Sequence, residues 1–158
     1  KNLPIQIKTI NINSKGENQV FEYQLDKEKE VIIDFTDETD RYLYEPNAAI
    51  MKAGAFKTIA SKFNLLKFHP NTHLYTHNQY FQDFPGRIFQ IEEVYGNSKQ
   101  ELQIIQKKYP KANISTRNYP LSAEALHKKA KISTGGETYI FALKTLSEKY
   151  KILICKKL

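Results

Sequence analysis

Two kinds of hydrophobic periodicity run along the chain, and the first is the alternation of apolar and polar residues that is typical of strands. It appears over residues 3–12 and 20–25, and the polar run 14–18 between them predicts a hairpin turn. A third short strand is expected over 30–35. Acidic residues at 34–40 follow without the glycine and terminal glutamate of a calcium loop, which favours a solvated loop.

The second kind of periodicity is helical. After Glu45 and Pro46, apolar residues recur at spacings of three and four, which predicts one helix ending near Asn64; they are Ala49, Ala53, Phe56, Ala60 and Phe63. Proline is favoured near a first helical position because its missing N–H would be unpaired there anyway. Such a stripe is typical of core packing, and docking on a partner domain is the alternative.

The sequence pattern of residues 68–85 predicts a long irregular stretch. It holds three of the four histidines, at intervals of four residues. On a helix this spacing could bind zinc. However, Pro70 breaks a helix after His69, and 74–76 reads as strand, where residues four apart lie ~13 Å from each other. Structural or surface histidines are therefore favoured over contacts to a ligand and over a metal site.

From Arg87 onward the pattern predicts strand, helix, strand, helix, strand, strand. Ser98 and Glu101 have the spacing of a capping box, and Pro110 ends the first helix. The second helix starts near Ser122, and Gly135-Gly136 is expected to turn the chain into the last two strands. This half is thus a compact α/β unit with helices on one or both faces of a sheet.

Composition limits the class of protein. The 158 residues are 41% hydrophobic, with no run long enough to span a membrane. The single cysteine, Cys155, fits a reducing compartment, so we expect a cytoplasmic location. The sequence begins at Lys1 with no methionine, and we therefore expect a fragment of a longer protein.

The net charge of +7 is concentrated in one part of the chain. Residues 1–46 carry 6 basic and 10 acidic groups, 47–85 carry 4 and 1, and 86–158 carry 14 and 6. The division suggests separable modules, the last of which faces a polyanion; a generally lysine-rich protein is the alternative.

No catalytic, cofactor-binding or metal-binding motif is evident. The six glycines form no phosphate-cradling loop, and Gly135-Gly136 lies between a helix and a strand, the wrong order for such a loop. Cys155 lies within an apolar strand, which favours a core residue over a nucleophile.

A basic surface with aromatic and polar neighbours remains as the candidate site. Its residues lie at the ends of the predicted elements and could contact phosphates, while a tyrosine could stack on an unpaired base; they are Lys107, Lys108, Lys111, Arg117, Asn118, Tyr119, Lys128, Lys129 and Lys131. Lysines at helix C-termini also interact favourably with the helix dipole without any ligand. The alternative that these lysines only stabilise their helices therefore stays open.

Several stretches carry a resemblance to a known family. They are YLYEPNAAIMKAGAF (42–56), HPNTHLYT (69–76), DFPGR (83–87), TRNYPLS (116–122) and GGETY (135–139). Together they resemble the C-terminal region of a family of bacterial class I S-adenosylmethionine-dependent methyltransferases, typical of Bacteroidetes, in which a small ferredoxin-like module precedes a THUMP-like module.

The resemblance implies an α/β (α+β) fold with three parts. Residues 1–41 would be a β-rich lead-in, perhaps the last strands of a methyltransferase domain, 42–86 the ferredoxin-like module and 87–158 a βαβαββ THUMP-like module. It implies RNA as substrate and an N-terminal catalytic domain that would bind S-adenosylmethionine outside this chain. Docking on that domain is expected at Glu45, Pro46, Asn47, Asn71 and His73.

Two functions therefore stay open from the sequence. The chain presents RNA to a methyltransferase domain, or it is a scaffold that docks on and stabilises that domain without binding nucleic acid. By itself it is expected to bind no cofactor and to catalyse no methyl transfer.

Overall fold

A computed structural model describes residues 3–158 as a mixed α/β fold with a two-stranded sheet, a seven-stranded sheet and five helices. The elements in chain order are β1 (Gln6–Ile12), β2 (Asn18–Gln24), α1 (Leu25–Glu30), β3 (Tyr42–Pro46), α2 (Ala48–Ala53), α3 (Phe56–Phe63), β4 (Leu66–His69), β5 (Thr72–His77), β6 (Gly86–Tyr95), α4 (Lys99–Lys108), β7 (Lys111–Arg117), α5 (Ala123–Ala130), β8 (Ser133–Lys144) and β9 (Tyr150–Lys157). The expected fold class is confirmed.

The large sheet has the order β4-β5-β3-β6-β9-β8-β7. All its pairs are antiparallel except β7 with β8, which run parallel because α5 connects them. The long strand β6 pairs with β3 over Gly86–Gln90 and with β9 over Phe89–Tyr95. It therefore joins the half of the sheet around β3 to the half around β9.

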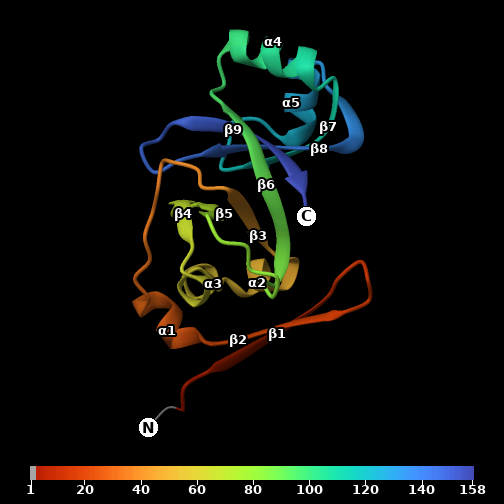
Figure 1. Ribbon diagram of the computed structural model, residues 1–158. Coiled ribbons are helices and arrows are strands. Elements are labelled where there is room, and N and C mark those ends of the chain that lie inside the picture. Colours follow the sequence, from red (N-terminus) through yellow and green to blue (C-terminus); the bar gives the residue numbers. More distant parts are fainter. Residues whose placement is uncertain (1–2) are drawn as a thin grey trace.

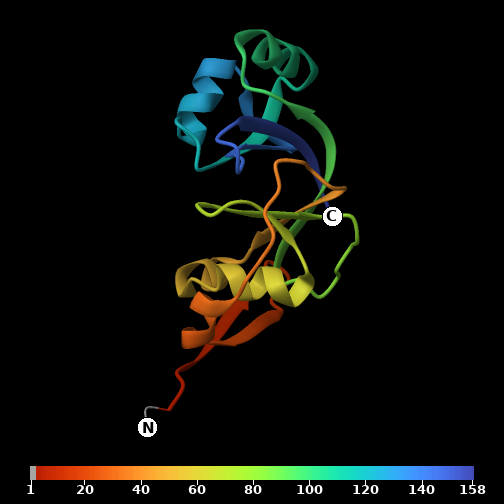
Figure 2. The same ribbon diagram turned by 90° about the vertical axis from the view of Figure 1, so that its left-hand side faces the viewer.

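The elements are stacked in layers along the long axis of the molecule (Figure 1). Helices α4 and α5 lie at one end, above the half of the sheet formed by β6, β9, β8 and β7. The β4-β5-β3 half lies beneath it, then α2 and α3, and the β1–β2 hairpin lies at the other end (Figure 2). The sheet is thus bent so that one of its halves faces the other.

Three buried clusters correspond to these layers. The middle one fills the space between the two halves of the sheet, with Leu43 and Phe68 from one half and Phe141 and Leu153 from the other. The upper cluster joins α4 and α5 to β7, β8 and β9, and the lower one joins α2 and α3 to the sheet and the hairpin. Cys155 is buried in the middle cluster, and burial raises the pKa of its thiol, which confirms the core assignment.

The lead-in, residues 3–41, packs on the half of the molecule around β3, α2 and α3 instead of standing apart. Phe21 and Tyr23 of β2 are buried in the lower cluster, and the Tyr23 hydroxyl donates to the carbonyl of Ala53. The hairpin is confirmed, but the third strand expected over 30–35 is wrong. Residues 25–30 form α1, and only Phe35 makes an isolated bridge, with Lys67.

The single helix expected from Pro46 to Asn64 is also wrong, because the chain forms two helices there. Pro46 ends β3, and the Asn47 side chain caps α2 by accepting from the amide of Ile50. Gly54 adopts a left-handed φ of 76° and ends α2, so the chain changes direction before α3. The hydrophobic spacing continues across this break because both helices face the same core.

Residues 68–77 are not irregular as expected but form the end of β4 and all of β5. The side chain of Lys67 explains this hairpin, since its ammonium donates to the carbonyls of His69, Pro70 and Thr72 at 2.7–2.8 Å. Lys67 is 2% exposed, and no carboxylate among residues 3–158 lies within ion-pair distance of it. The lysine ammonium therefore ties together three carbonyls in and beside the β4–β5 turn.

In the second half the predicted order of elements is confirmed, including the capping box of Ser98 and Glu101. The turn expected at Gly135-Gly136 is wrong, because both glycines lie inside β8. Their φ values of 114° and 81° produce an irregularity at which the pairing of β7 with β8 shifts. The left-handed Lys131 ends α5 instead. Within residues 3–158 no helix is long and apolar enough to span a membrane.

Candidate nucleic-acid interface

A groove of about 730 Å³ lies between α4 and α5 on the outer face of the second half. Its floor is apolar and its rim is basic and amidic; the lining residues are Lys99, Leu102, Gln103, Gln106, Lys107, Lys129, Ala130 and Lys131. No acidic residue lines it, and these four lysines form no ion pair within the part of the chain that the structure describes. The groove therefore carries uncompensated positive charge.

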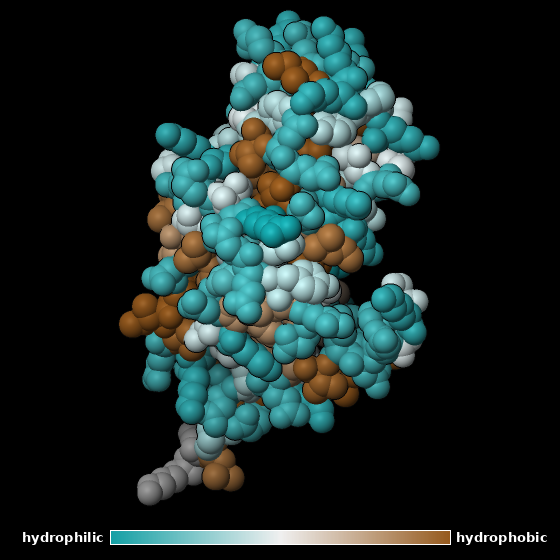
Figure 3. Space-filling model, viewed as in Figure 1, coloured by the Kyte–Doolittle hydropathy of each residue, from teal (hydrophilic) through white to brown (hydrophobic). Residues whose placement is uncertain are grey.

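The two helices place this charge by ordinary local rules. The capping box fixes the start of α4, so that Leu102 and Ile105 face the sheet while Gln103 and Lys107 face outward. Lys107 lies in the last turn of α4, and Lys129 in the last turn of α5, where the helix dipole favours cations. The surface over both helices is mainly hydrophilic (Figure 3).

Three of the predicted contact residues, Lys107, Lys129 and Lys131, thus come together in one groove. Lys108 points elsewhere and binds Glu93 at 2.9 Å. Hydrogen bonds from Tyr109, Tyr95 and Lys108 lower the pKa of Glu93 to about 2. This lysine is already paired inside the chain.

Lys128 and Lys111 also lie outside the groove. Lys128 pairs with Glu124 one turn earlier on α5, at 3.1 Å, and both side chains are exposed. Lys111 begins β7, the edge strand of the sheet, and its side chain runs beside Gly135 and Gly136, where a Cβ on Gly135 would lie 3.0 Å from the lysine Cε. The glycines make room for that lysine.

Arg117 takes part in an ion-pair cluster between the halves of the sheet. Its guanidinium donates to Oε2 of Glu45 at 2.9 Å, and Arg87 donates to Oε1 at 2.7–2.8 Å. The Glu45 side chain is only 10% exposed, so the carboxylate is held by both arginines. Glu45 from β3 thereby ties together β6 and β7.

Asn118 and Tyr119 line a second cleft, of about 470 Å³, where β7 ends. Asn118 has a left-handed φ of 51°, which asparagine tolerates better than most residues. Tyr119 packs edge-on against Tyr150, with ring centroids 5.3 Å apart. Of the nine predicted contact residues, three line the groove, two line the second cleft, three are paired within the chain, and Lys111 lies beside Gly135 and Gly136 at the sheet edge.

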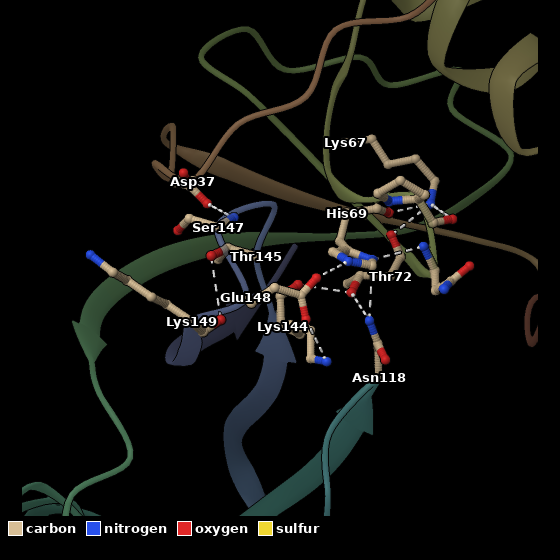
Figure 4. A network of polar contacts seen from close by, with 12 residues as sticks. Asp37, Lys67, His69, Thr72, Asn118, Lys144, Thr145, Ser147, Glu148 and Lys149 are labelled. Carbon is tan, nitrogen blue, oxygen red and sulfur yellow. Dashed lines mark hydrogen bonds and ion pairs between the residues drawn. The ribbon is translucent and has the colours of Figure 1, made fainter.

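The second cleft adjoins a polar network between the two halves (Figure 4). His69 binds Glu148 through Nε2 at 2.8 Å, while its Nδ1 accepts from the amide of Asn71. The Asn118 amide contacts His69 Nδ1 and Thr72 Oγ1, and the Thr72 hydroxyl donates to the carbonyl of Lys144. The β4–β5 turn is thus fixed against the ends of β7 and β8.

The predicted docking residues serve mainly inside the chain. Glu45, Pro46 and Asn47 are buried, and Asn47 donates to Gln19 of the hairpin as well as capping α2. His73 stacks on Phe56 with centroids 3.5 Å apart; desolvation, Lys67 and Arg117 lower its pKa to about 4. Asn71 alone is exposed. Docking at these positions stays a prediction.

The sequence reasoning missed Lys99, Gln103 and Gln106 of the groove. Lys99, Gln103 and Lys107 are four residues apart, so the helical period that predicted the buried face of α4 could also have shown its outward face. In residues 3–158 no three His, Cys, Asp or Glu side chains are grouped to hold a metal ion.

Comparison with known proteins defines the class of this fold. A family model for a ferredoxin-like domain matches residues 42–85, and one for a THUMP domain-like fold matches residues 86–157. The chain therefore contains a ferredoxin-like domain followed by a THUMP-like domain.

A solved structure with the same arrangement is a protein of Porphyromonas gingivalis W83 described as a "putative methyltransferase". The two chains are 39% identical, with a TM-score of 0.90 over 96% of this chain. The match spans 38% of the Porphyromonas chain, so that protein is much longer than this chain. No curated protein matches the chain.

Proposed function

We propose that this chain presents RNA to the catalytic domain of a methyltransferase. The observation that carries the proposal is the lysine-rimmed groove between α4 and α5, which lies on the THUMP-like domain. THUMP domains in other enzymes hold RNA for a catalytic partner, and the Porphyromonas protein described as a methyltransferase has more chain than this one. RNA suits the groove because each phosphate contact by lysine releases counterions.

Methyl transfer would require S-adenosylmethionine, and we assign its binding to the catalytic domain. Gly96 alone lies in a loop from a strand to a helix, and a Cβ there would lie 2.6 Å from Glu101. The Glu101 carboxylate already accepts from the amides of Gly96 and Ser98, so the helix N-terminus holds a carboxylate of its own. The occupied helix start beside Gly96 supports this assignment of the cofactor to the catalytic domain.

Charge reversal in the groove tests the proposal. The triple variant Lys107→Glu, Lys129→Glu, Lys131→Glu is compared with Lys15→Glu, Lys52→Glu, Lys156→Glu, which changes the net charge equally at exposed lysines elsewhere. Binding to a structured RNA is measured between 50 and 300 mM salt. We expect the groove variant to lose at least about tenfold in affinity and to have a shallower salt slope, by about 2. Equal losses in both variants would contradict a site in the groove.

A second function, docking on the catalytic domain, is favoured by a separate observation. The outer face of the β1–β2 hairpin exposes three apolar side chains, Ile10 (57%), Ile12 (69%) and Val20 (48%). Ile10 and Val20 are direct partners across the two strands. Contiguous exposed apolar residues are typical of an interaction surface.

This alternative has its own test. The part of the Porphyromonas protein outside the matched region is added to the chain, and the melting temperature of the chain is measured. Docking through the hairpin predicts a rise that the double variant Ile10→Lys, Val20→Lys loses, because the lysines interrupt the apolar face. An unchanged melting temperature for the unmodified chain would exclude docking. RNA affinity is expected to stay the same in this variant.

A further inference from the structure

The second cleft, at the end of β7, has walls that suit a ligand other than phosphate. Its polar side chains include Asn118 and Ser122, its aromatic ones Tyr119 and Tyr150, and its one cation is Lys144. The volume of about 470 Å³ lies within the range of small-molecule sites in proteins. The cleft is therefore large enough for one planar ring system.

The charge of this cleft is nearly balanced. The ammonium of Lys144 lies 2.8 Å from Oε2 of Glu148, whose other oxygen binds His69. A phosphate at this place would have to compete with a carboxylate that is already bound. In the groove between α4 and α5, by contrast, no acidic residue is present. The two cavities thus differ in chemistry: the groove suits phosphates and the cleft suits a neutral group.

The cleft is also rigid and has free hydrogen-bonding capacity. The Asn118 amide nitrogen contacts His69 and Thr72, and these contacts fix the side chain. Its carbonyl oxygen has no hydrogen-bond partner among the described residues and can accept one from a ligand. The Ser122 hydroxyl oxygen accepts from Ala125 and can still donate its own proton. Fixed acceptors and donors beside aromatic rings are the features with which proteins hold unpaired bases.

Helix α5 connects the two cavities. Its cap, Ser122, lines the cleft, and its end, Lys129 to Lys131, lines the groove. Eight helical residues span about 12 Å. A single strand running along α5 can therefore place its phosphates in the groove and a base in the cleft.

We propose that the cleft binds one unpaired nucleobase of the RNA strand whose phosphates occupy the α4–α5 groove. The inference rests on the proposed function and adds to it the single-stranded character of the substrate. The base stacks on the ring of Tyr150, because the Tyr119 and Tyr150 rings meet at 80° and one plane stacks on only one of them. It hydrogen-bonds to Asn118 and Ser122, and Lys144 stays paired with Glu148.

Free nucleosides test the cleft without relying on RNA binding. The 158-residue chain is titrated with adenosine and uridine to millimolar concentration, and in parallel with inorganic phosphate, while backbone amide shifts are followed by NMR. We expect the nucleosides to shift the amides of Asn118, Tyr119 and Tyr150, and phosphate to shift those of Lys129 and Lys131. Nucleosides that leave the cleft amides unchanged, or phosphate that shifts them instead, would overturn the proposal.

Variants then test the cleft with an oligonucleotide. Tyr150→Ala is expected to weaken binding of a single-stranded RNA by about tenfold and leave the salt slope unchanged. Tyr150→Phe keeps the ring and is expected to bind as the unmodified chain does, and Tyr80→Ala, at an exposed tyrosine of the other domain, serves as control. Equal losses for Tyr150→Ala and Tyr80→Ala would contradict the base site. If no RNA binds at any salt concentration, the proposed function fails, while the nucleoside titration still decides the cleft.

Discussion

Glu45 at the end of β3 and Arg117 at the end of β7 form an ion pair, although 72 residues separate them in the chain. Arg87 binds the other oxygen of the same carboxylate. Glu45→Gln would leave two guanidinium groups against a neutral amide. Because both arginines are partly exposed, we expect a loss of about 2 kcal/mol in the free energy of unfolding, below the range for fully buried pairs.

Urea unfolding at pH 7 measures this loss. The matched control is Glu22→Gln, which breaks the pair of Glu22 with Lys8, two side chains that are both more than half exposed. That change is expected to cost less than about 0.5 kcal/mol. Similar costs for the two variants would show that the Glu45 cluster does not tie the domains together.

Arg117→Glu is a poor test of RNA binding, because it would disrupt the ion pair of Arg117 with Glu45.

Glu28 of α1 caps a helix to which it does not belong. Its carboxylate accepts from the amides of Lys57 and Thr58 at 2.6 and 2.8 Å, at the start of α3, whose own cap residue Ala55 has no side-chain acceptor. Glu28→Ala is expected to lower the free energy of unfolding by about 1 kcal/mol. Hydrogen exchange at the two amides should accelerate, whereas Glu30→Ala, at an exposed neighbour, should leave their exchange unchanged.

Because of Lys67, we expect the free energy of unfolding to depend on pH in an unusual way above neutrality. Burial lowers its pKa to about 7, below the ordinary value of 10.5 that it regains on unfolding. Between these values the unfolded chain binds more protons, so the free energy of unfolding rises with pH. The three carbonyls that hold the ammonium reduce the effect, and we expect a gain of about 1 kcal/mol between pH 7 and 8.5.

Lys67→Met should remove this gain, and chemical unfolding of both proteins across that range measures it. The range stops at pH 8.5 because the buried Cys155 thiol has a raised pKa. Above its unfolded value, that group destabilises the fold as pH rises. A slope that is the same in the Lys67→Met variant would assign the pH dependence to other groups.

Because of His73, we expect the folded chain to lose stability in weak acid. Burial and the nearby cations lower its pKa to about 4 from the ordinary 6.5, so the unfolded chain takes up a proton in this window and the folded chain does not. Stability that is present above pH 6.5 is lost as the pH falls toward 4, by about 1–2 kcal/mol because the ring is only half-buried. The difference between the unmodified chain and His73→Phe, which keeps the stack on Phe56, isolates this contribution.

The sequence predicted the second half of the fold better than the first because its signals are local. The capping box of Ser98 and Glu101 and the helical period of α4 involve residues a few positions apart. In the first half, α1 buries no residue and is fixed by the distant contact of Glu28, and the β4–β5 turn depends on the buried Lys67. No periodic pattern predicts a lysine in a core.

In the candidate site, too, local features could be predicted from the sequence and distant contacts could not. Charge and position predicted Lys107, Lys129 and Lys131, which lie in the groove. They could not show that Lys108 is bound by Glu93, or that Arg117 is bound by Glu45, because those partners come from other strands. Which basic residues remain available to a polyanion depends on tertiary pairing.

The strand β6 crosses from one domain to the other without interruption, and this has a consequence for how the protein unfolds. The limit between the two family matches, at residues 85 and 86, coincides with the first residue of β6, yet that strand supplies five partners to β3 and most of its length to β9. Cutting the chain there would deprive β3 of a neighbour and expose the apolar layer around Phe89. We therefore expect the two domains to unfold as one cooperative unit, in a single thermal transition.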